Sequence, residues 1–163
     1  MTAFRRRVAR AASADSIEEC RARAVRLLTV RARSREELRR ALEVRGFSSD
    51  AIRRTLDALV RDGSLNQQAA LETFLVNRAE RFSRERLRAE LRQKGFPTAS
   101  IDGALASTTD DDERALLDSL YRRRSQDLAN LPPEKRKKKI FDFLRRRGFS
   151  APQIFETMGE PED

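Results

Sequence analysis

The chain has 163 residues, of which 37% are charged and 6% aromatic, and its 35 Lys and Arg against 26 Asp and Glu give a net charge of +9. It contains no histidine and one cysteine, Cys20, which excludes an intrachain disulfide and a zinc site built from several Cys and His ligands. No apolar run approaches the ~20 residues that span a bilayer. A basic chain of this size favours polyanions or an acidic protein partner over a charge that serves solubility alone.

The chain begins with a basic segment and then a helix. The start, MTAFRRRVARAAS, is rich in Arg and free of acids, so residues 1–15 are expected to form a disordered basic tail, with a mitochondrial-type presequence as the alternative. A helix is predicted from about Ser16, because Ser16 and Glu19 have the spacing of a capping box. Cys20 lies on the apolar face of this helix, so it is expected to be a buried, inert thiol rather than a nucleophile, for which no histidine base exists.

A second helix and a sharp turn follow. Ser34, with Glu37 three positions on, marks the helix start, and Gly46 marks its end. Glycine adopts the left-handed conformation that ends a helix, where another residue would clash. Phe47 then falls where an apolar side chain packs back on the last turn, and Ser48 starts a third helix.

The rest of the chain repeats this pattern. The stretch RALEVRGFSSDAI at 40–52 returns as AELRQKGFPTASI at 89–101 and as DFLRRRGFSAPQI at 142–154. The three glycines lie 49 and 53 residues apart, and apolar residues recur eight and four positions before each of them and six and ten positions after it. The turn residues of the three copies are Gly46, Phe47, Gly95, Phe96, Gly148 and Phe149. Each Phe is expected to plug the core rather than to stack on single-stranded bases.

One more helix precedes each helix-turn-helix pair, and the acids at 110–113 stand where the third of these begins. We therefore predict an all-α protein of three tandem three-helix, helix-turn-helix-like repeats, stacked into an elongated curved body without strands. The predicted boundaries are a basic tail at 1–15, repeats at 16–62, 63–107 and 108–158, and an acidic tail at 159–163.

The repeats resemble those of a known bacterial family. Ser34-Arg35-Glu36-Glu37-Leu38 leading to Arg45-Gly46-Phe47 is similar to the first repeat of RecX, and Arg86-Leu87-Arg88-Ala89-Glu90-Leu91-Arg92-Gln93-Lys94-Gly95 to its second. Phe143-Leu144-Arg145-Arg146-Arg147-Gly148-Phe149-Ser150 is similar to its third. The resemblance covers roughly residues 20 to 158. Two positions depart from the family pattern: Leu65-Asn66-Gln67-Gln68 replaces an acidic stretch, and Ser83 stands where glycine is common.

The resemblance implies a function as well as a fold. RecX-like proteins bind within the groove of the RecA filament on single-stranded DNA, and most inhibit the ATPase, strand exchange and coprotease activities of RecA. This chain is therefore expected to be a non-enzymatic, cytoplasmic regulator of recombination and the SOS response. The expected partners are the RecA filament and single-stranded DNA, bound directly or through the filament. No cofactor and no membrane are expected, and the chain is expected to be a monomer.

The positive charge is concentrated in two segments. Residues 1–33 and 134–147 each carry a net charge of +6, so the remainder of the chain is slightly acidic. Non-recurring cations are the better candidates for binding, because the recurring Arg45, Lys94 and Arg147 each end a helix and favour its exposed carbonyls. The predicted partner- or DNA-binding residues are Arg39, Arg86, Arg88, Arg92, Lys135, Arg136, Lys137, Lys138, Lys139, Arg145 and Arg146.

The sequence is also compatible with one other class of function and disfavours another. Three-helix units with basic helices also occur in DNA-binding proteins of the helix-turn-helix type. The alternative is therefore a nucleic-acid-binding protein that acts without RecA. An enzyme is disfavoured, because the chain has no histidine, no Gly-rich phosphate loop and no carboxylate pair placed in an apolar pocket.

Overall fold

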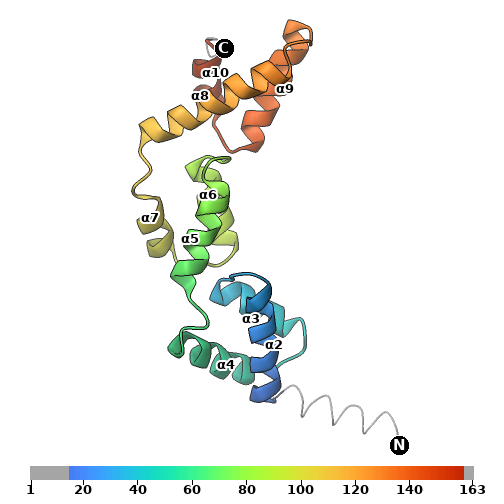
Figure 1. The fold of residues 1–163 in the computed structure, drawn as a ribbon, viewed down its shortest axis with the longest axis vertical. Helices are drawn as coiled ribbons and strands as arrows, with labels where there is room; N and C mark the ends of the chain where they lie inside the picture. Colours follow the sequence, from blue (N-terminus) through green and yellow to red (C-terminus); the bar gives the residue numbers. More distant parts are fainter. Residues whose placement is uncertain (1–14, 160–163) are drawn as a thin grey trace, which may run out of the picture. The chain divides into compact units, whose positions relative to one another are not determined.

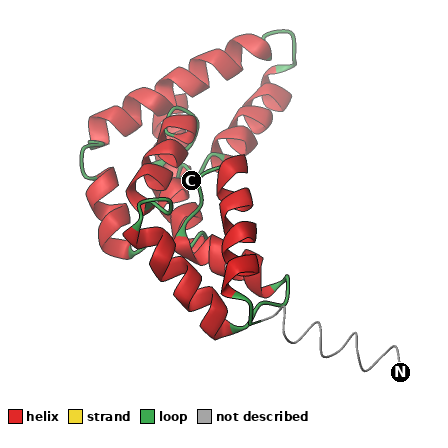
Figure 2. Cartoon of the chain, turned by 60° about the horizontal axis from the view of Figure 1, so that its bottom comes forward, coloured by secondary structure: helices red, strands yellow, loops and turns green. Residues whose placement is uncertain are grey.

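The computed structural model describes residues 15–159 (Figure 1). The described residues form helices joined by loops and contain no strand, as Figure 2 shows. The helices are α2 (Ile17–Val30), α3 (Arg35–Glu43), α4 (Ser49–Arg61), α5 (Gln67–Arg78), α6 (Arg84–Gln93), α7 (Thr98–Leu105), α8 (Asp110–Asp127), α9 (Pro133–Arg146) and α10 (Ala151–Met158). The predicted tails lie outside the described residues except for Asp15 and Gly159. In residues 15–159, every helix is too short or too polar to cross a membrane.

The chain forms two compact units. The first extends to Thr73 and includes the separate segment Gln93–Pro97, and the second comprises Phe74–Arg92 and the chain from Thr98 onwards. Gln93–Pro97 contains the turn of the second repeat. This turn therefore belongs to the first unit, whereas most of the second repeat belongs to the second unit. The repeat boundaries at 16–62, 63–107 and 108–158 stay a prediction, because the compact units divide the chain at other points.

The helix starts follow the capping residues that the sequence indicates. The hydroxyl of Ser16 accepts a hydrogen bond from the Glu19 N–H at 3.2 Å. Ser34 and Glu37 form the full capping box, in which the hydroxyl accepts from the Glu37 N–H and the Glu37 carboxylate accepts from the Ser34 N–H. A capping side chain of this kind stabilises a helix by about 1 kcal/mol. Local sequence therefore fixes where these helices begin.

The glycine turns have the geometry that the repeat predicts. Gly46, Gly95 and Gly148 all adopt positive φ, at 86°, 77° and 96°. After α3, the Gly46 N–H bonds to the Glu43 carbonyl at 2.8 Å and the Phe47 N–H reaches the Leu42 carbonyl at 3.4 Å. This is the Schellman pattern, which satisfies carbonyls left without partners at a helix end. The turn at Gly148 repeats both bonds, at 3.0 and 3.4 Å.

Each unit has its own apolar core. In the first, α2, α3 and α4 bury Cys20, Leu38, Leu42 and Ile52, and Phe47 packs on this cluster. In the second, α8, α9 and α10 pack together (Figure 1) and bury the core residues Leu117, Ile140, Leu144, Phe149 and Ile154. Phe47 and Phe149 thus pack in cores with the leucine five positions earlier, as predicted. Phe141 is half-buried beside the second core and stacks on Phe155, with ring centroids 5.2 Å apart.

Two of the glycine turns dock on the start of a distant helix. In the first unit, the Ser34 hydroxyl at the start of α3 donates to the Lys94 carbonyl, and the Lys94 ammonium pairs with Glu37 at 2.9 Å. The Arg40 guanidinium donates to the Gln93 carbonyl at 3.2 Å. A Cβ on Gly95 would overlap the Glu36 side chain. Glycine is therefore required here by close approach as well as by φ.

A similar contact, made through a different donor, is present in the second unit. The Ser83 N–H, at the start of α6, donates to the Arg147 carbonyl at 2.9 Å, while the Ser83 hydroxyl caps the helix by accepting from the Arg86 N–H at 3.2 Å. A Cβ on Gly148 would overlap both the Ser83 hydroxyl and the Arg86 side chain. Ser83, which departs from the family pattern, is buried and fills a capping role here.

Candidate nucleic-acid interface

Helix α9 displays the densest positive charge among the predicted binding residues. Pro132 and Pro133 start the helix without a side-chain cap, and the Arg136 N–H bonds to the Pro132 carbonyl at 2.9 Å. Proline fits the first turn, because its missing N–H would have no partner there. Ile140 and Leu144 bury one face in the core of the second unit. Because this face is buried, the cations at 135–139, which precede Ile140, lie mainly on the solvent side of the helix.

Most cations of this run have no acidic partner. Lys135, Lys138 and Lys139 are exposed, and Arg136 is half-buried. Within residues 15–159, none of these four forms an ion pair. Lys137 is exposed too. Exposed cations that are not neutralised by neighbouring carboxylates can release counterions from a polyanion, which makes α9 the strongest part of the candidate interface.

Arg145 and Arg146, near the end of the same helix, differ from each other. One guanidinium N–H of Arg145 donates to the Phe149 carbonyl at 2.9 Å, so Arg145 also holds the turn after α9. Arg146 is exposed and forms no ion pair within the described part of the chain. Arg146 is therefore the better binding candidate of the two.

The predicted arginines of α6 are largely paired with carboxylates. Arg86 pairs with Glu90 at 2.9 Å. Arg88 pairs with Asp102 at 3.3 Å. Arg92 is exposed, and no carboxylate pairs with it in the stretch that the structure describes. Exposed pairs of this kind contribute about 0–1 kcal/mol, so a polyanion could displace them, but they weaken the local positive potential.

Arg39 belongs to the first unit and is also neutralised. It pairs with Glu36 at 2.7 Å and additionally with Glu43 on α3. In the sequence, Arg39 has the position in the first repeat that Arg88 has in the second, and Glu43 stands where the second repeat has Arg92. The structure does not bring Arg39 into the second unit, where all the other predicted binding residues lie.

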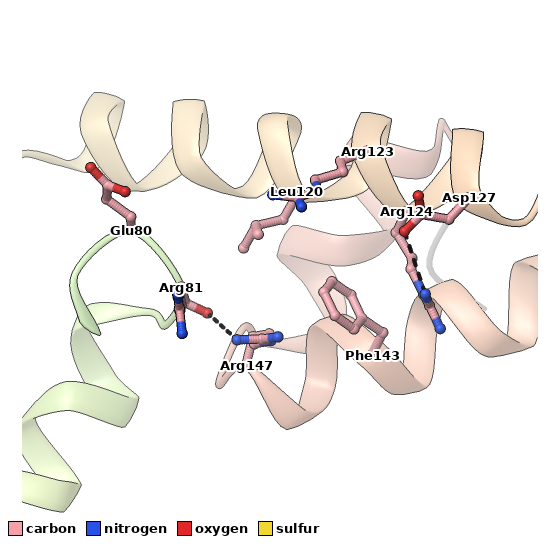
Figure 3. A pocket seen from close by; sticks show the side chains of 8 residues that line it. All are labelled: Glu80, Arg81, Leu120, Arg123, Arg124, Asp127, Phe143 and Arg147. Atoms are coloured by element: carbon pink, nitrogen blue, oxygen red, sulfur yellow. Dashed lines mark hydrogen bonds and ion pairs between the residues drawn. The ribbon is translucent and has the colours of Figure 1, made fainter. Parts of the chain in front are cut away.

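A pocket beside α9 is lined by arginines that are not among the predicted binding residues. It is lined by Glu80, Arg81, Leu120, Arg123, Arg124, Asp127, Phe143 and Arg147, all of them in the second unit (Figure 3). They come from the loop after α5, the second half of α8 and the end of α9. The run Arg122-Arg123-Arg124 in the sequence was the signal that could have pointed to this site.

Arginine and phenylalanine side chains alternate next to this pocket. The Arg147 guanidinium lies over the Phe82 ring at 5.0 Å and over the Phe143 ring at 4.8 Å. Arg78 lies 4.6 Å from the Phe82 ring, and Arg124 lies 5.2 Å from the Phe143 ring. Such cation–π contacts each contribute about 0.5–2 kcal/mol, depending on how far the cation is desolvated. Phe82 is thus engaged by arginines rather than available to stack on a base.

The recurring cations before each glycine have three different environments. Arg45 donates to the Ala41 carbonyl at 2.5 Å, which is the helix-end role predicted for all three. Lys94 pairs instead with Glu37. Arg147 lies over the Phe82 and Phe143 rings and donates to the Arg81 carbonyl at 3.3 Å. Burial lowers the pKa of the Arg147 guanidinium, and repulsion from Arg81 and other nearby arginines adds to the effect.

The fold and this surface define a class: a helical repeat protein built from three-helix units, with a basic face on the second compact unit. Family models identify the class more closely. Residues 20–59 match the model described as "RecX, first three-helix domain", and residues 111–158 match "RecX, third three-helix domain".

Individual relatives agree with the family models. The chain is 36% identical to the regulatory protein RecX of Chlorobaculum tepidum, with 83% of each chain covered. It is 35% identical to the regulatory protein RecX of Pseudomonas fluorescens, covering 86% of this chain and 90% of the relative. A crystal structure of RecX from Lactobacillus salivarius superposes with a TM-score of 0.67 at 19% identity, over 88% of this chain and 94% of the other. The chain belongs to the RecX family of regulatory proteins.

Proposed function

We propose that this protein regulates RecA by binding the RecA filament on single-stranded DNA, and that it inhibits the ATPase, strand exchange and coprotease activities of RecA. In this proposal it acts as a monomer in the cytoplasm, without a cofactor, a membrane or a reaction of its own. Membership of the RecX family supports the RecA partner. Lys135, Arg136, Lys138 and Lys139 of α9 form no ion pair within residues 15–159, and this is the observation that supports contact with a polyanionic filament.

The mode of binding follows from the charge of the second unit. Each phosphate contact on single-stranded DNA changes the salt dependence of log K by about 0.7 per log unit of salt. Four cations of the α9 run form no ion pair with any described residue, so contacts made through them are expected to give a marked salt dependence. Carboxylates in a filament groove would be attracted by the same cations, with a similar dependence on salt.

The decisive test is the ATPase of RecA on single-stranded DNA at physiological salt, with this protein titrated in and its binding to bare DNA measured alongside. Inhibition at concentrations that leave bare DNA mostly unbound is the expected result. If RecA turnover does not change, the proposal is wrong.

A matched pair of variants connects the activity to α9. Lys135→Glu/Lys138→Glu reverses two exposed cations three positions apart, and Arg23→Glu/Arg26→Glu does the same on α2 of the first unit. The α9 double variant is expected to weaken inhibition at least tenfold, and the α2 variant less than threefold, as estimated from charge-dependent binding. Equal loss in both variants would assign the effect to net charge rather than to α9.

The second candidate function is a nucleic-acid-binding protein that acts without RecA, and the same uncompensated cations favour it. A protein of this kind would hold bare DNA tightly with a steep salt dependence. It would inhibit RecA only at concentrations where it already coats the DNA, which the bare-DNA measurement detects.

A further inference from the structure

The arginine pocket of the second unit holds more positive than negative charge. It has a volume of about 400 Å³ and is lined by four arginines and two carboxylates. One carboxylate, Asp127, is engaged with Arg124 at 3.5 Å, as the dashed line in Figure 3 shows. The other, Glu80, points away from Arg147 (Figure 3). Neither Arg81, Arg123 nor Arg147 forms an ion pair within residues 15–159.

Arg147 is held in one orientation at the wall of this pocket. Its guanidinium lies over both the Phe82 and the Phe143 ring, 5.0 and 4.8 Å from their centroids. One edge N–H donates to the Arg81 carbonyl at 3.3 Å. A guanidinium fixed in this way loses little conformational entropy when it binds a partner, so it is preorganised.

The three uncompensated arginines come from three separate segments. Arg81 lies on the loop after α5, Arg123 lies on α8, and Arg147 directly follows α9. Bringing like charges together costs electrostatic energy, and repulsion from Arg81 contributes to the lowered pKa of Arg147. An anion in the pocket would remove this repulsion. Donors that approach from several directions fit the tetrahedral oxygens of a phosphate better than the two coplanar oxygens of a carboxylate.

We propose that this pocket binds a phosphate group, through the guanidinium groups of Arg81, Arg123 and Arg147. The phosphate belongs to a nucleic-acid backbone or to a free nucleotide, and the chemistry of recognition is the same for both. Phosphate binding itself does not require RecA. Only the assignment of the phosphate to a nucleic-acid backbone rests on the proposed function. The arginine–phenylalanine contacts hold the pocket in shape, and the exposed Arg81 and Arg123 complete it.

The test is an NMR titration of the full chain, at constant ionic strength, with three probes: inorganic phosphate, adenosine monophosphate and a short oligothymidylate. We expect saturable shifts in the amide signals of residues 80–82, 123–124 and 143–147. Arg123→Ala and Arg81→Ala remove exposed side chains that have no ion pair, so circular dichroism should show them folded. Arg122→Ala is the matched control, because it removes the same charge from an exposed neighbour on α8 that does not line the pocket.

Arg123→Ala is expected to weaken phosphate binding about tenfold, as for loss of a charge-assisted hydrogen bond, whereas Arg122→Ala should change it less than twofold. If Arg123→Ala weakens the oligothymidylate as well, the phosphate comes from nucleic acid. If it weakens only phosphate and the mononucleotide, the ligand is a free nucleotide. Both results support the pocket.

Two results would overturn the proposal: no saturable shift with any probe, or equal weakening by Arg122→Ala and Arg123→Ala. Neither result bears on the RecA ATPase assay. A failure of the pocket and a failure of the proposed function can therefore be told apart.

Discussion

Replacing Gly95 by alanine tests whether the turn of the second repeat is fastened to the start of α3. Gly95 has a φ of 77°, and its added Cβ would overlap Cβ and Cγ of Glu36. Gly46 is the matched control, because its φ is 86° and nothing among the described residues lies within 4 Å of an added Cβ. Both substitutions impose the left-handed strain, but only Gly95→Ala also forces two segments apart.

The expected magnitudes differ for that reason. An alanine in the left-handed region costs about 1–2 kcal/mol, and this is the whole effect expected for Gly46→Ala. Gly95→Ala must in addition displace Glu36, which lies one residue from Glu37, the partner of Lys94. The contacts at risk are the bonds from Ser34 to the Lys94 carbonyl, from Arg40 to the Gln93 carbonyl and from Lys94 to Glu37. At about 0.5–1.5 kcal/mol each, their loss brings the total for Gly95→Ala to about 2.5–6.5 kcal/mol.

Urea unfolding followed by circular dichroism measures the free energy of unfolding of the wild type and of both variants. Gly95→Ala should lower it by at least about 1.5 kcal/mol more than Gly46→Ala does, since three hydrogen bonds are at risk only at Gly95. Equal destabilisation would refute the reasoning, because it would mean that the backbone conformation matters and the docking on α3 does not. Equal stability of both variants and the wild type would refute the turn geometry as well.

Three further substitutions or treatments test other parts of the fold. Burial alone would raise the pKa of Glu37, but hydrogen bonds from Arg31, Lys94 and Ser34 lower it from 4.5 to about 2. Above pH 4.5, ionised Glu37 should therefore add up to about 3 kcal/mol to the free energy of unfolding. This stability should be lost as the pH falls towards 2. Glu37→Gln should make the acid unfolding curve less steep by removing this contribution, while Glu36 and Asp62, whose pKa values are also lowered, keep theirs. Ser83→Ala should lower the melting temperature through a loss of about 1 kcal/mol, and Ser83→Gly by less, since glycine is an acceptable cap; the reverse order would contradict a capping role. Cys20 is fully buried, and burial raises its thiol pKa, so a thiol reagent should react with it only as fast as the first unit opens; rapid labelling of the native protein would contradict the core assignment.

The features that the sequence predicted correctly are those encoded within a few residues. Ser34 and Glu37 form their capping box because both halves of it lie within one turn. Gly46 adopts positive φ because no other residue type enters that conformation at so little cost. The buried leucines follow from the four-residue spacing of a helical face. None of these features depends on how distant segments pair.

Docking of the turns on helix starts could not be predicted in this way. Ser34 and Lys94 are 60 residues apart, and nothing in either local sequence specifies the other. The recurring cations illustrate the same limit. Arg45, Lys94 and Arg147 occupy one position of the repeat, so the sequence predicted one helix-end role for all three. Arg45 bonds to a carbonyl of its own helix, whereas Lys94 pairs with the Glu37 carboxylate and Arg147 lies over aromatic rings. Distant segments therefore determine these contacts of Lys94 and Arg147.

The ranking of binding residues depends on the same distant contacts. Counting charges along the sequence gives Arg39, Arg86 and Arg88 the same weight as the lysines of α9. In the folded units, carboxylates on the same or a neighbouring helix already hold these three arginines. Arg123 was not selected, although it has no ion pair in the described chain and lines a pocket. A polyanion gains most where it displaces no carboxylate from a cation. Lys135, Arg136, Lys138 and Lys139 of α9, and Arg81, Arg123 and Arg147 of the pocket, should therefore contribute more to binding than residues of equal formal charge elsewhere.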